Sequence, residues 1–157
     1  MKPVAALLAG ALIVAPWTAA AADAERPALD GIWLTDQGDG TVEILECGNL
    51  LCGSVYSIIR LPNPSRPPLD ARNEDPALQS RPLCGMPIFG AMQRLEPDKW
   101  GDGWLYDPHD GKTYRADLTL ESTNQLAVHG YVGITLLGRT VYWTRMPGQV
   151  DKCSPPH

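Results

Sequence analysis

The chain has 157 residues, of which 44% are hydrophobic and 20% charged, and its formal net charge is −5. A chain of this length forms one domain large enough to bury a core of its own. No basic run occurs in the sequence, so nucleic acid is excluded as an expected partner and anionic membrane surfaces are disfavoured.

The first 22 residues have the pattern of a secretory signal peptide. A basic start is followed by a short apolar run and by alanines, with Ala20 and Ala22 at the −3 and −1 positions of the expected cut. An uncleaved membrane anchor is the alternative, but it needs about 20 apolar residues, and Pro16 interrupts the run earlier. We therefore expect a mature domain of residues 23–157 in the periplasm or secreted, and not integral to the membrane.

Strand signals dominate the mature chain. The clearest is 113–121, where Tyr114, Ala116, Leu118 and Leu120 alternate with polar residues, as in a half-buried antiparallel strand. The expected strands cover 32–36, 41–47, 50–59, 88–95, 103–106, 113–121, 125–131 and 139–145. Eight strands with short connections predict an all-β, antiparallel up-and-down β-barrel, or failing that a sandwich.

Two connections have distinct signatures. Gly48–Asn49 between apolar flanks indicates a two-residue hairpin turn, most simply of type II′. Residues 60–87 contain seven of the fifteen prolines and little periodicity, and Asn73 or Asp75 is placed to cap one helical turn there. A loop of this length is typical of a functional lid or of a disordered segment.

Four cysteines lie in the mature chain. In an oxidising compartment an even number favours two disulfides, and a zinc site is the weaker alternative because no CxxC pair occurs and no histidine sits at ligand spacing. Cys47 and Cys52 flank the hairpin turn. They lie directly opposite if the loop covers 48–51, or form a diagonal pair near the distance limit if Gly48–Asn49 alone makes the turn.

Several blocks, in order along almost the whole mature chain, resemble the bacterial domain of unknown function 2147 family, and Gly31-Ile32-Trp33 resembles the opening of lipocalin-like barrels. The blocks are 47–53 (CGNLLCG), 73–76 (NEDP), 81–85 (RPLCG), 106–108 (YDP), 111–114 (GKTY) and 130–145. The resemblance implies a small exported lipocalin-like barrel and no particular reaction. It also implies that Cys84 bonds Cys153 of the C-terminal tail 146–157, as many lipocalins tie that segment.

Barrel topology places particular residues at each end. The last strand pairs with the first, so Arg145 should lie beside Trp33 at the closed end, where a cation–π contact is favourable, as in the lipocalin barrel floor. The loops 36–40, 60–87, 107–111 and 132–138 should lie at the open end, with the long loop over the mouth. The polar residues expected there are Asp70, Asn73, Asp75, Arg81, Asp107, His109, Asp110, Lys112 and Arg139.

Chemistry-bearing patterns are sparse. The segment 107–112 is explained as a turn, because proline, aspartate and glycine account for its positions. Asp70, Asn73 and Asp75 offer oxygen ligands without an EF-hand pattern, and His129 fits a satisfied strand histidine. No recognisable catalytic, phosphate-binding or dinucleotide motif is present. We therefore expect no enzyme, no catalytic residue, no cofactor and no metal site.

The expected function is binding of a small apolar or amphipathic ligand inside the barrel. Many small strand residues leave room for a modest cavity, and Arg139 at the mouth is the candidate for an anionic head group. The residues expected to line the site are Trp33, Tyr56, Trp104, Tyr114, Arg139 and Trp143. The alternatives are an envelope module with a filled interior that binds a protein partner and, third, an enzyme of unknown reaction.

Overall fold

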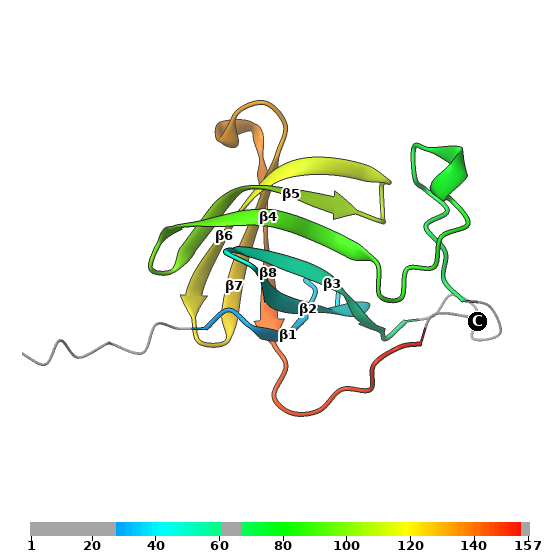
Figure 1. The fold of residues 1–157 in the computed structure, drawn as a ribbon, viewed down its shortest axis with the longest axis horizontal. Coiled ribbons are helices and arrows are strands. Elements are labelled where there is room, and N and C mark those ends of the chain that lie inside the picture. The colour runs from blue at the N-terminus through cyan, green and yellow to red at the C-terminus, as the bar shows by residue number, and fades with distance from the viewer. Residues whose placement is uncertain (1–27, 61–66, 155–157) are drawn as a thin grey trace, which may run out of the picture.

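The computed structural model describes residues 28–60 and 67–154, which form a closed barrel of eight strands (Figure 1). The predicted signal peptide lies outside the described residues. The strands are β1 (Gly31–Leu34), β2 (Gly40–Cys47), β3 (Leu50–Ile58), β4 (Pro87–Glu96), β5 (Lys99–Asp107), β6 (Lys112–Ser122), β7 (Gln125–Tyr131) and β8 (Arg139–Arg145). Two 3₁₀ turns, η1 (Pro76–Leu78) and η2 (Thr135–Leu137), lie in the connections. No helix in these ranges is long and apolar enough to cross a membrane.

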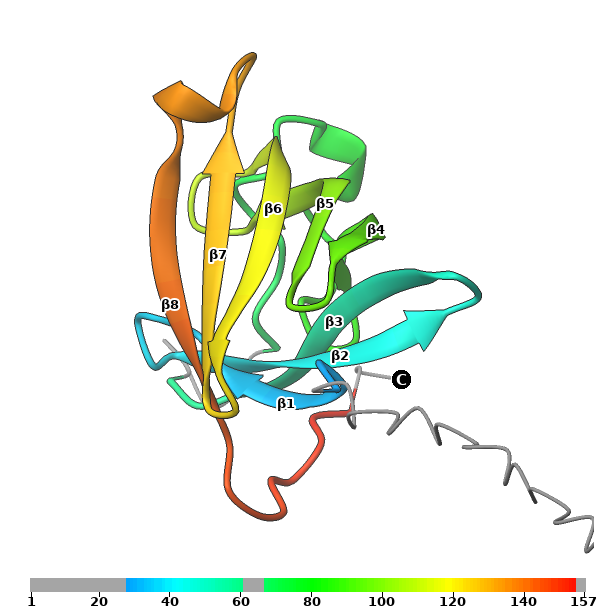
Figure 2. The ribbon, with the colours of Figure 1, turned by 90° about the vertical axis from the view of Figure 1, so that its left-hand side faces the viewer.

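Each strand pairs antiparallel with the next, and β8 pairs with β1 to close the cylinder. The all-β, up-and-down topology predicted from the sequence is therefore confirmed. The first strand is shorter than expected because the chain turns after Leu34, where the backbone N–H of Gly38 donates to the carbonyl of Thr35 at 3.0 Å. This turn leads directly into β2 (Figure 2).

Alternation along the strands builds the core. On β6, Ala116, Leu118 and Leu120 are buried, while the residues between them are more exposed, as the period of two predicts. Trp33 and Phe89 are both fully buried. Burial of each side chain of this size stabilises the fold by roughly 1.5–3 kcal/mol.

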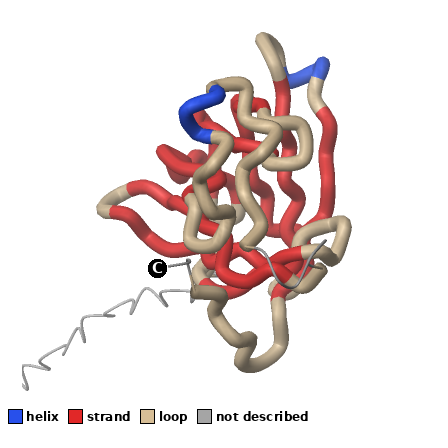
Figure 3. Tube along the Cα trace, turned by 90° about the vertical axis from the view of Figure 1, so that its right-hand side faces the viewer, coloured by secondary structure: helices blue, strands red, loops and turns tan. Residues whose placement is uncertain are grey.

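The long loop does not cover the mouth as expected. Its described part, 67–86, runs along the side of the barrel (Figure 3), and Asp75 caps η1 by accepting from the backbone N–H of Ala77 at 2.9 Å. The loop is held there by hydrogen bonds from Arg72 to the carbonyl of His109 and from Tyr106 to Asp70, and Gly111, with φ of +77°, lets the carbonyl of Arg72 approach closely. A side chain at Gly111 would collide with that carbonyl, so the sequence there permits this docking.

Both predicted disulfides form. Cys47 pairs with Leu50 across the hairpin, so Gly48–Asn49 alone makes the turn and Cys47 and Cys52 are the diagonal pair, with Cα atoms 6.0 Å apart. Gly48 has φ of +71°, as the first central residue of a type II′ turn requires. Cys84 bonds Cys153 at a Cα separation of 5.8 Å and ties the tail to the barrel.

Candidate functional site

A cavity of about 350 Å³ opens at the end of the barrel where β1, β5 and β7 end and β6 and β8 begin. Three of the four loops expected at the mouth contribute to it, through residues 35–37, 107–110 and 132 with 137–138. The fourth, the long loop, contributes none of its described residues. Three short connections therefore border the mouth, and residues 67–86, the described part of the proline-rich loop, do not line it.

The wall of the cavity is mainly aliphatic and aromatic. Leu105 comes from β5, Val128 from β7, and Val141 and Trp143 from β8. Gly130 on β7 also lines the cavity, and its missing side chain leaves space opposite Leu105. Polar residues of the short connections border the same cavity, among them Asp36, Asp107, His109 and Asp110. An apolar wall with polar groups at one end is a usual form of a small-molecule site.

Two of the predicted ligand residues add polar groups at the rim. Arg139 lines the cavity, is exposed, and forms no ion pair with a carboxylate in the described part of the chain. Tyr114 also lines the cavity and donates its hydroxyl to Asp110, a hydrogen bond that raises the pKa of Tyr114 to about 12. Arg139 is consequently the cation available to a bound molecule.

The other three predicted ligand residues do not line the cavity. Trp33 is fully buried at the opposite end of the barrel. Tyr56 on β3 lies under Lys152 of the C-terminal tail, with the Lys152 Nζ atom 5.2 Å from its ring centroid. Trp104 on β5 is 37% exposed and packs its indole against Gly90 of β4. Of the six residues, the structure thus brings together Tyr114, Arg139 and Trp143.

Trp33 and Arg145 form the floor. They are register partners of β1 and β8, and the Arg145 guanidinium carbon lies 4.3 Å from the Trp33 ring centroid. The guanidinium also donates to the carbonyls of Thr123, Asp30 and Ala28 at 2.6, 2.7 and 2.8 Å. Burial lowers the pKa of Arg145 from its ordinary value, against the weaker attraction of Asp30. This arginine closes the barrel end away from the cavity.

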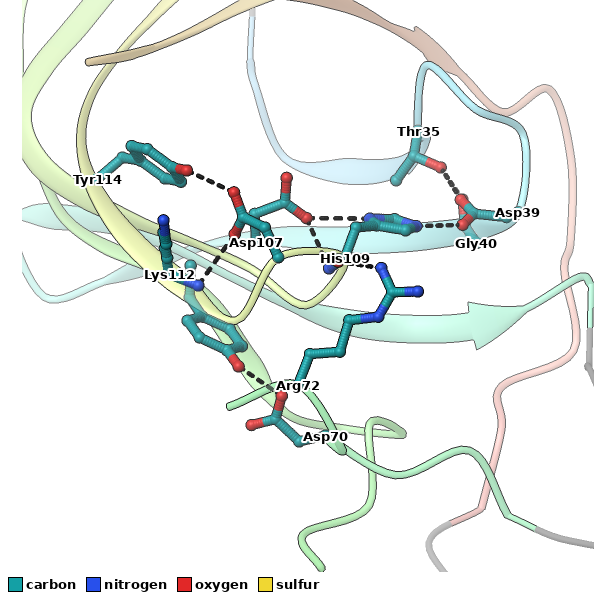
Figure 4. Close-up of polar contacts among 11 residues, drawn as sticks. Thr35, Asp39, Gly40, Asp70, Arg72, Asp107, His109, Lys112 and Tyr114 are labelled. Atoms are coloured by element: carbon teal, nitrogen blue, oxygen red, sulfur yellow. Dashed lines mark hydrogen bonds and ion pairs between the residues drawn. The ribbon is translucent and has the colours of Figure 1, made fainter. Parts of the chain in front are cut away.

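A histidine bridge spans the rim (Figure 4). The Nε2 atom of His109 lies 2.7 Å from Asp39 Oδ2, and its Nδ1 atom lies 2.9 Å from Asp107 Oδ1. Ionised carboxylates only accept hydrogen bonds, so the imidazole can donate to both of them only in its protonated form. The bridge joins the 35–39 turn to the 107–111 turn.

The pKa values of the bridge follow from these bonds. Partial burial by itself disfavours charge on His109, but the hydrogen bonds that His109 donates to Asp39 and Asp107 outweigh it and raise the pKa of His109. Burial likewise acts to raise the pKa of Asp39, and the hydrogen bonds from His109 and Thr35 outweigh it and lower that pKa. Both shifts favour the ion pair.

A second polar cluster anchors the long loop. Asp70 is buried and accepts hydrogen bonds from Tyr106, from Asn73 at 2.8 Å and from Arg81 at 2.8 Å. Burial and the bond to Asp70 raise the pKa of Tyr106 to about 12. The oxygens that the sequence offered as cation ligands are therefore engaged by protein donors, and Asp75 is engaged as the cap of η1.

Sequence reasoning missed part of the site. Asp39 was assigned only to a turn, and nothing local in the sequence relates it to His109, 70 positions away. The aliphatic lining was also missed, although a period of two places Leu126 and Val128 on one face of β7, and Val141 and Trp143 on one face of β8, and could have shown it.

Comparisons with known proteins agree with this architecture. Residues 31–145 match the model of a family described as "Uncharacterized protein conserved in bacteria (DUF2147)". A solved structure, described as protein HP1028 from the human pathogen Helicobacter pylori and as belonging to the lipocalin family, superposes with a TM-score of 0.67 and 23% sequence identity. The match covers 76% of this chain and 84% of that chain, and shows a shared fold. The chain matches no curated protein.

Proposed function

The chain belongs to the bacterial family DUF2147, and from the geometry of its barrel we propose that it binds a small apolar or amphipathic molecule in the cavity at the open end. The cavity itself is the observation that carries this proposal. Small-molecule sites occupy roughly 300–1,000 Å³, and the mouths of β-barrels are a preferred place for them. At about 350 Å³, this cavity suits a compact ligand rather than a long lipid chain.

The apolar wall together with Arg139 suits a ligand with one apolar body and one anionic end that contacts Arg139, since Asp107 and Asp110 of the lining are engaged by His109 and Tyr114. Val128, Val141 and Trp143 offer apolar contact, and Arg139 offers a guanidinium without an internal carboxylate partner among the described residues. Burial of apolar surface contributes roughly 25 cal/mol per Å² before entropic costs, which supports an affinity of roughly micromolar strength for a ligand of this size.

The proposal contains no catalytic step. The rim groups that resemble catalytic parts are bonded to one another, as in the bridge from Asp39 through His109 to Asp107. The alternative, an envelope module that binds a protein partner and has a filled interior, would need no cavity. Saturable binding of a small molecule in the cavity therefore distinguishes a ligand-binding barrel from such an envelope module.

Export is part of the proposal. Two disulfides are compatible with an oxidising compartment, and residues 1–22 have the pattern of a cleavable signal. The intact mass of the protein recovered from the periplasm or medium should correspond to a chain starting at or near Asp23. A retained Met1 would contradict this part.

The ligand proposal is tested by titration with medium-chain carboxylates while tryptophan fluorescence is followed. Trp143 lines the cavity and is the expected reporter. Arg139→Ala should weaken binding of a carboxylate about tenfold, the contribution of one charge-assisted contact, and should leave binding of the corresponding alcohol unchanged.

Arg115→Ala is the matched control, because Arg115 is an exposed arginine of β6 that does not line the cavity and lies over the ring of Tyr131. Its affinity for the carboxylate should equal that of the wild type. An absence of saturable binding with every ligand, in the wild-type protein, would refute the proposal.

A further inference from the structure

The connection between β7 and β8 is an apolar projection. Residues 132–138 contain no charged side chain, and the segment extends beyond the barrel at its open end (Figures 1 and 2). Its large side chains are Val132, Ile134, Leu136 and Leu137, which are 67, 59, 86 and 74% exposed. Single exposed apolar residues are ordinary, but four of them gathered between positions 132 and 137 on a projecting segment indicate an interaction site.

The projection has a defined backbone conformation. Within η2, the N–H of Leu137 donates to the carbonyl of Ile134 at 3.1 Å, and the N–H of Gly138 donates to the carbonyl of Thr135 at 3.2 Å. The Thr135 carbonyl is also within 2.8 Å of His129 Nε2 on β7. Internal pairing of backbone groups is what a segment needs when it leaves water for a lipid phase.

The surroundings of the projection match a phospholipid surface. Arg139 stands at the start of β8, directly after the apolar segment, and Arg115 stacks on Tyr131 at the end of β7. Both arginines are exposed, and a guanidinium binds phosphate oxygens well. Arg115 forms an exposed ion pair with Asp102 at 3.5 Å, so Arg139 is the more accessible of the two for phosphate. Apolar side chains at a tip, with cations at its base, complement the acyl and phosphate layers of a bilayer in that order.

The projection is also continuous with the cavity. Val132 and Leu137 belong both to the exposed apolar surface and to the lining of the mouth. A molecule passing between a bilayer and the cavity would thus remain on apolar surface. This continuity favours a lipid surface over a protein partner as the occupant.

We propose that residues 132–138 insert their apolar side chains into the surface of a phospholipid bilayer and hold the barrel mouth against it. The contact is peripheral, and it goes beyond the proposed ligand binding, which it neither requires nor implies. The net charge of the chain is −5, so the apolar side chains, rather than the charge of the protein, must supply most of the attraction.

The test uses the mature protein and flotation with vesicles of phosphatidylcholine or of phosphatidylethanolamine mixed with phosphatidylglycerol. The wild type should float with both. The double variant Ile134→Ser/Leu136→Ser should lower the partition coefficient about tenfold, since it removes two of the four inserted side chains. Neither residue lines the cavity, so the ligand affinity of the double variant in buffer without lipid should equal that of the wild type.

Leu45→Ser/Leu95→Ser is the matched control, because these leucines are 47 and 49% exposed and lie on β2 and β4, away from the projection. This variant should float like the wild type. The proposal is overturned if the wild type does not float, or if both double variants lose flotation equally. It is also overturned if the projection instead joins two copies of the chain. In that case the wild type would be a dimer without lipid, and the Ile134→Ser/Leu136→Ser variant would be a monomer.

Discussion

Arg145 and Trp33 are direct partners across the seam where the last strand meets the first, with the guanidinium 4.3 Å from the ring centroid. The same guanidinium donates to three backbone carbonyls, two of them in the segment that precedes β1. The side chain therefore joins both strands of the seam and the chain that enters it. Charge-assisted hydrogen bonds and a stacked cation are among the stronger polar contacts of proteins.

We predict that Arg145→Lys destabilises the fold by about 2 kcal/mol, because lysine keeps the charge but cannot reach three carbonyls in a fork. Urea unfolding of the oxidised protein measures this. Arg94→Lys is the control, since Arg94 also stacks on a tryptophan, Trp100, but from an exposed position. Equal losses in the two variants would show that the seam has no special role.

The two disulfides should differ in their contribution to stability. Cys84 and Cys153 are separated by 69 positions, whereas Cys47 and Cys52 are separated by 5. Loop entropy in the unfolded chain gives about 4 kcal/mol for the first and about 2 kcal/mol for the second. Urea unfolding of the two double cysteine-to-serine variants should show this order, and the reverse order would contradict it.

The His109 bridge predicts a pH-dependent stability. Because folding raises the pKa of His109, its contribution is fully present below the unfolded value of about 6.5 and is lost as the pH rises through the folded pKa. Asp39, with a lowered pKa, keeps its contribution above about 4. The pair therefore stabilises most between these limits.

His109→Gln should consequently be less stable than the wild type by about 0.5 kcal/mol at pH 5.5, as for a solvent-exposed ion pair, and by clearly less at pH 9. Thermal or urea unfolding at the two pH values provides the comparison. A difference that is the same at both would mean that His109 does not act through its charge.

Gly111 and Gly48 test the docking of the long loop. Both have positive φ, of +77° and +71°, so alanine strains the backbone at either by about 1 kcal/mol. A Cβ atom at Gly48 would meet no neighbour, whereas at Gly111 it would lie 1.7 Å from the Arg72 carbonyl oxygen. Gly111→Ala should therefore cost about 2 kcal/mol more and expose residues 67–86 to proteases. Equal losses of stability in Gly111→Ala and Gly48→Ala would mean that the long loop does not pack against Gly111.

The fold was predictable because its signals are local or follow from topology. The period of two in 113–121, the Gly48–Asn49 turn and the order of the family-like blocks are readable in the sequence. The Trp33–Arg145 contact follows from counting strands, since only the first and last strands of an up-and-down barrel meet at that seam.

The cavity lining was less predictable because irregular strands change the alternation. Trp100 and Trp104 are four positions apart, and strict alternation would place both on one face. The register shifts between Trp100 and Gly103, at Asp102 with φ of +58°, so Trp100 is buried and Trp104 is exposed. On β3, the register with β2 shifts between Thr41, which pairs with Ser57, and Val42, which pairs with Val55, so Tyr56 has no partner on β2.

The most direct test of the proposed function narrows the cavity itself. Gly130 lines it with an ordinary strand conformation, and a Cβ atom there would only reach van der Waals contact with Leu105 and Tyr114, at 3.6 and 3.7 Å. Gly130→Val should therefore fold and fill part of the space. Thr113→Val, on the exposed face of β6, adds an apolar side chain outside the cavity and is the control.

The decisive measurement is a calorimetric titration of the wild type, Gly130→Val and Thr113→Val with the same medium-chain carboxylate. We predict one saturable site in the wild type and in Thr113→Val, and an affinity about tenfold lower in Gly130→Val, because the added side chain displaces the ligand from part of the wall. Equal affinity in all three proteins, or no binding in the wild type, would contradict a ligand site in this cavity.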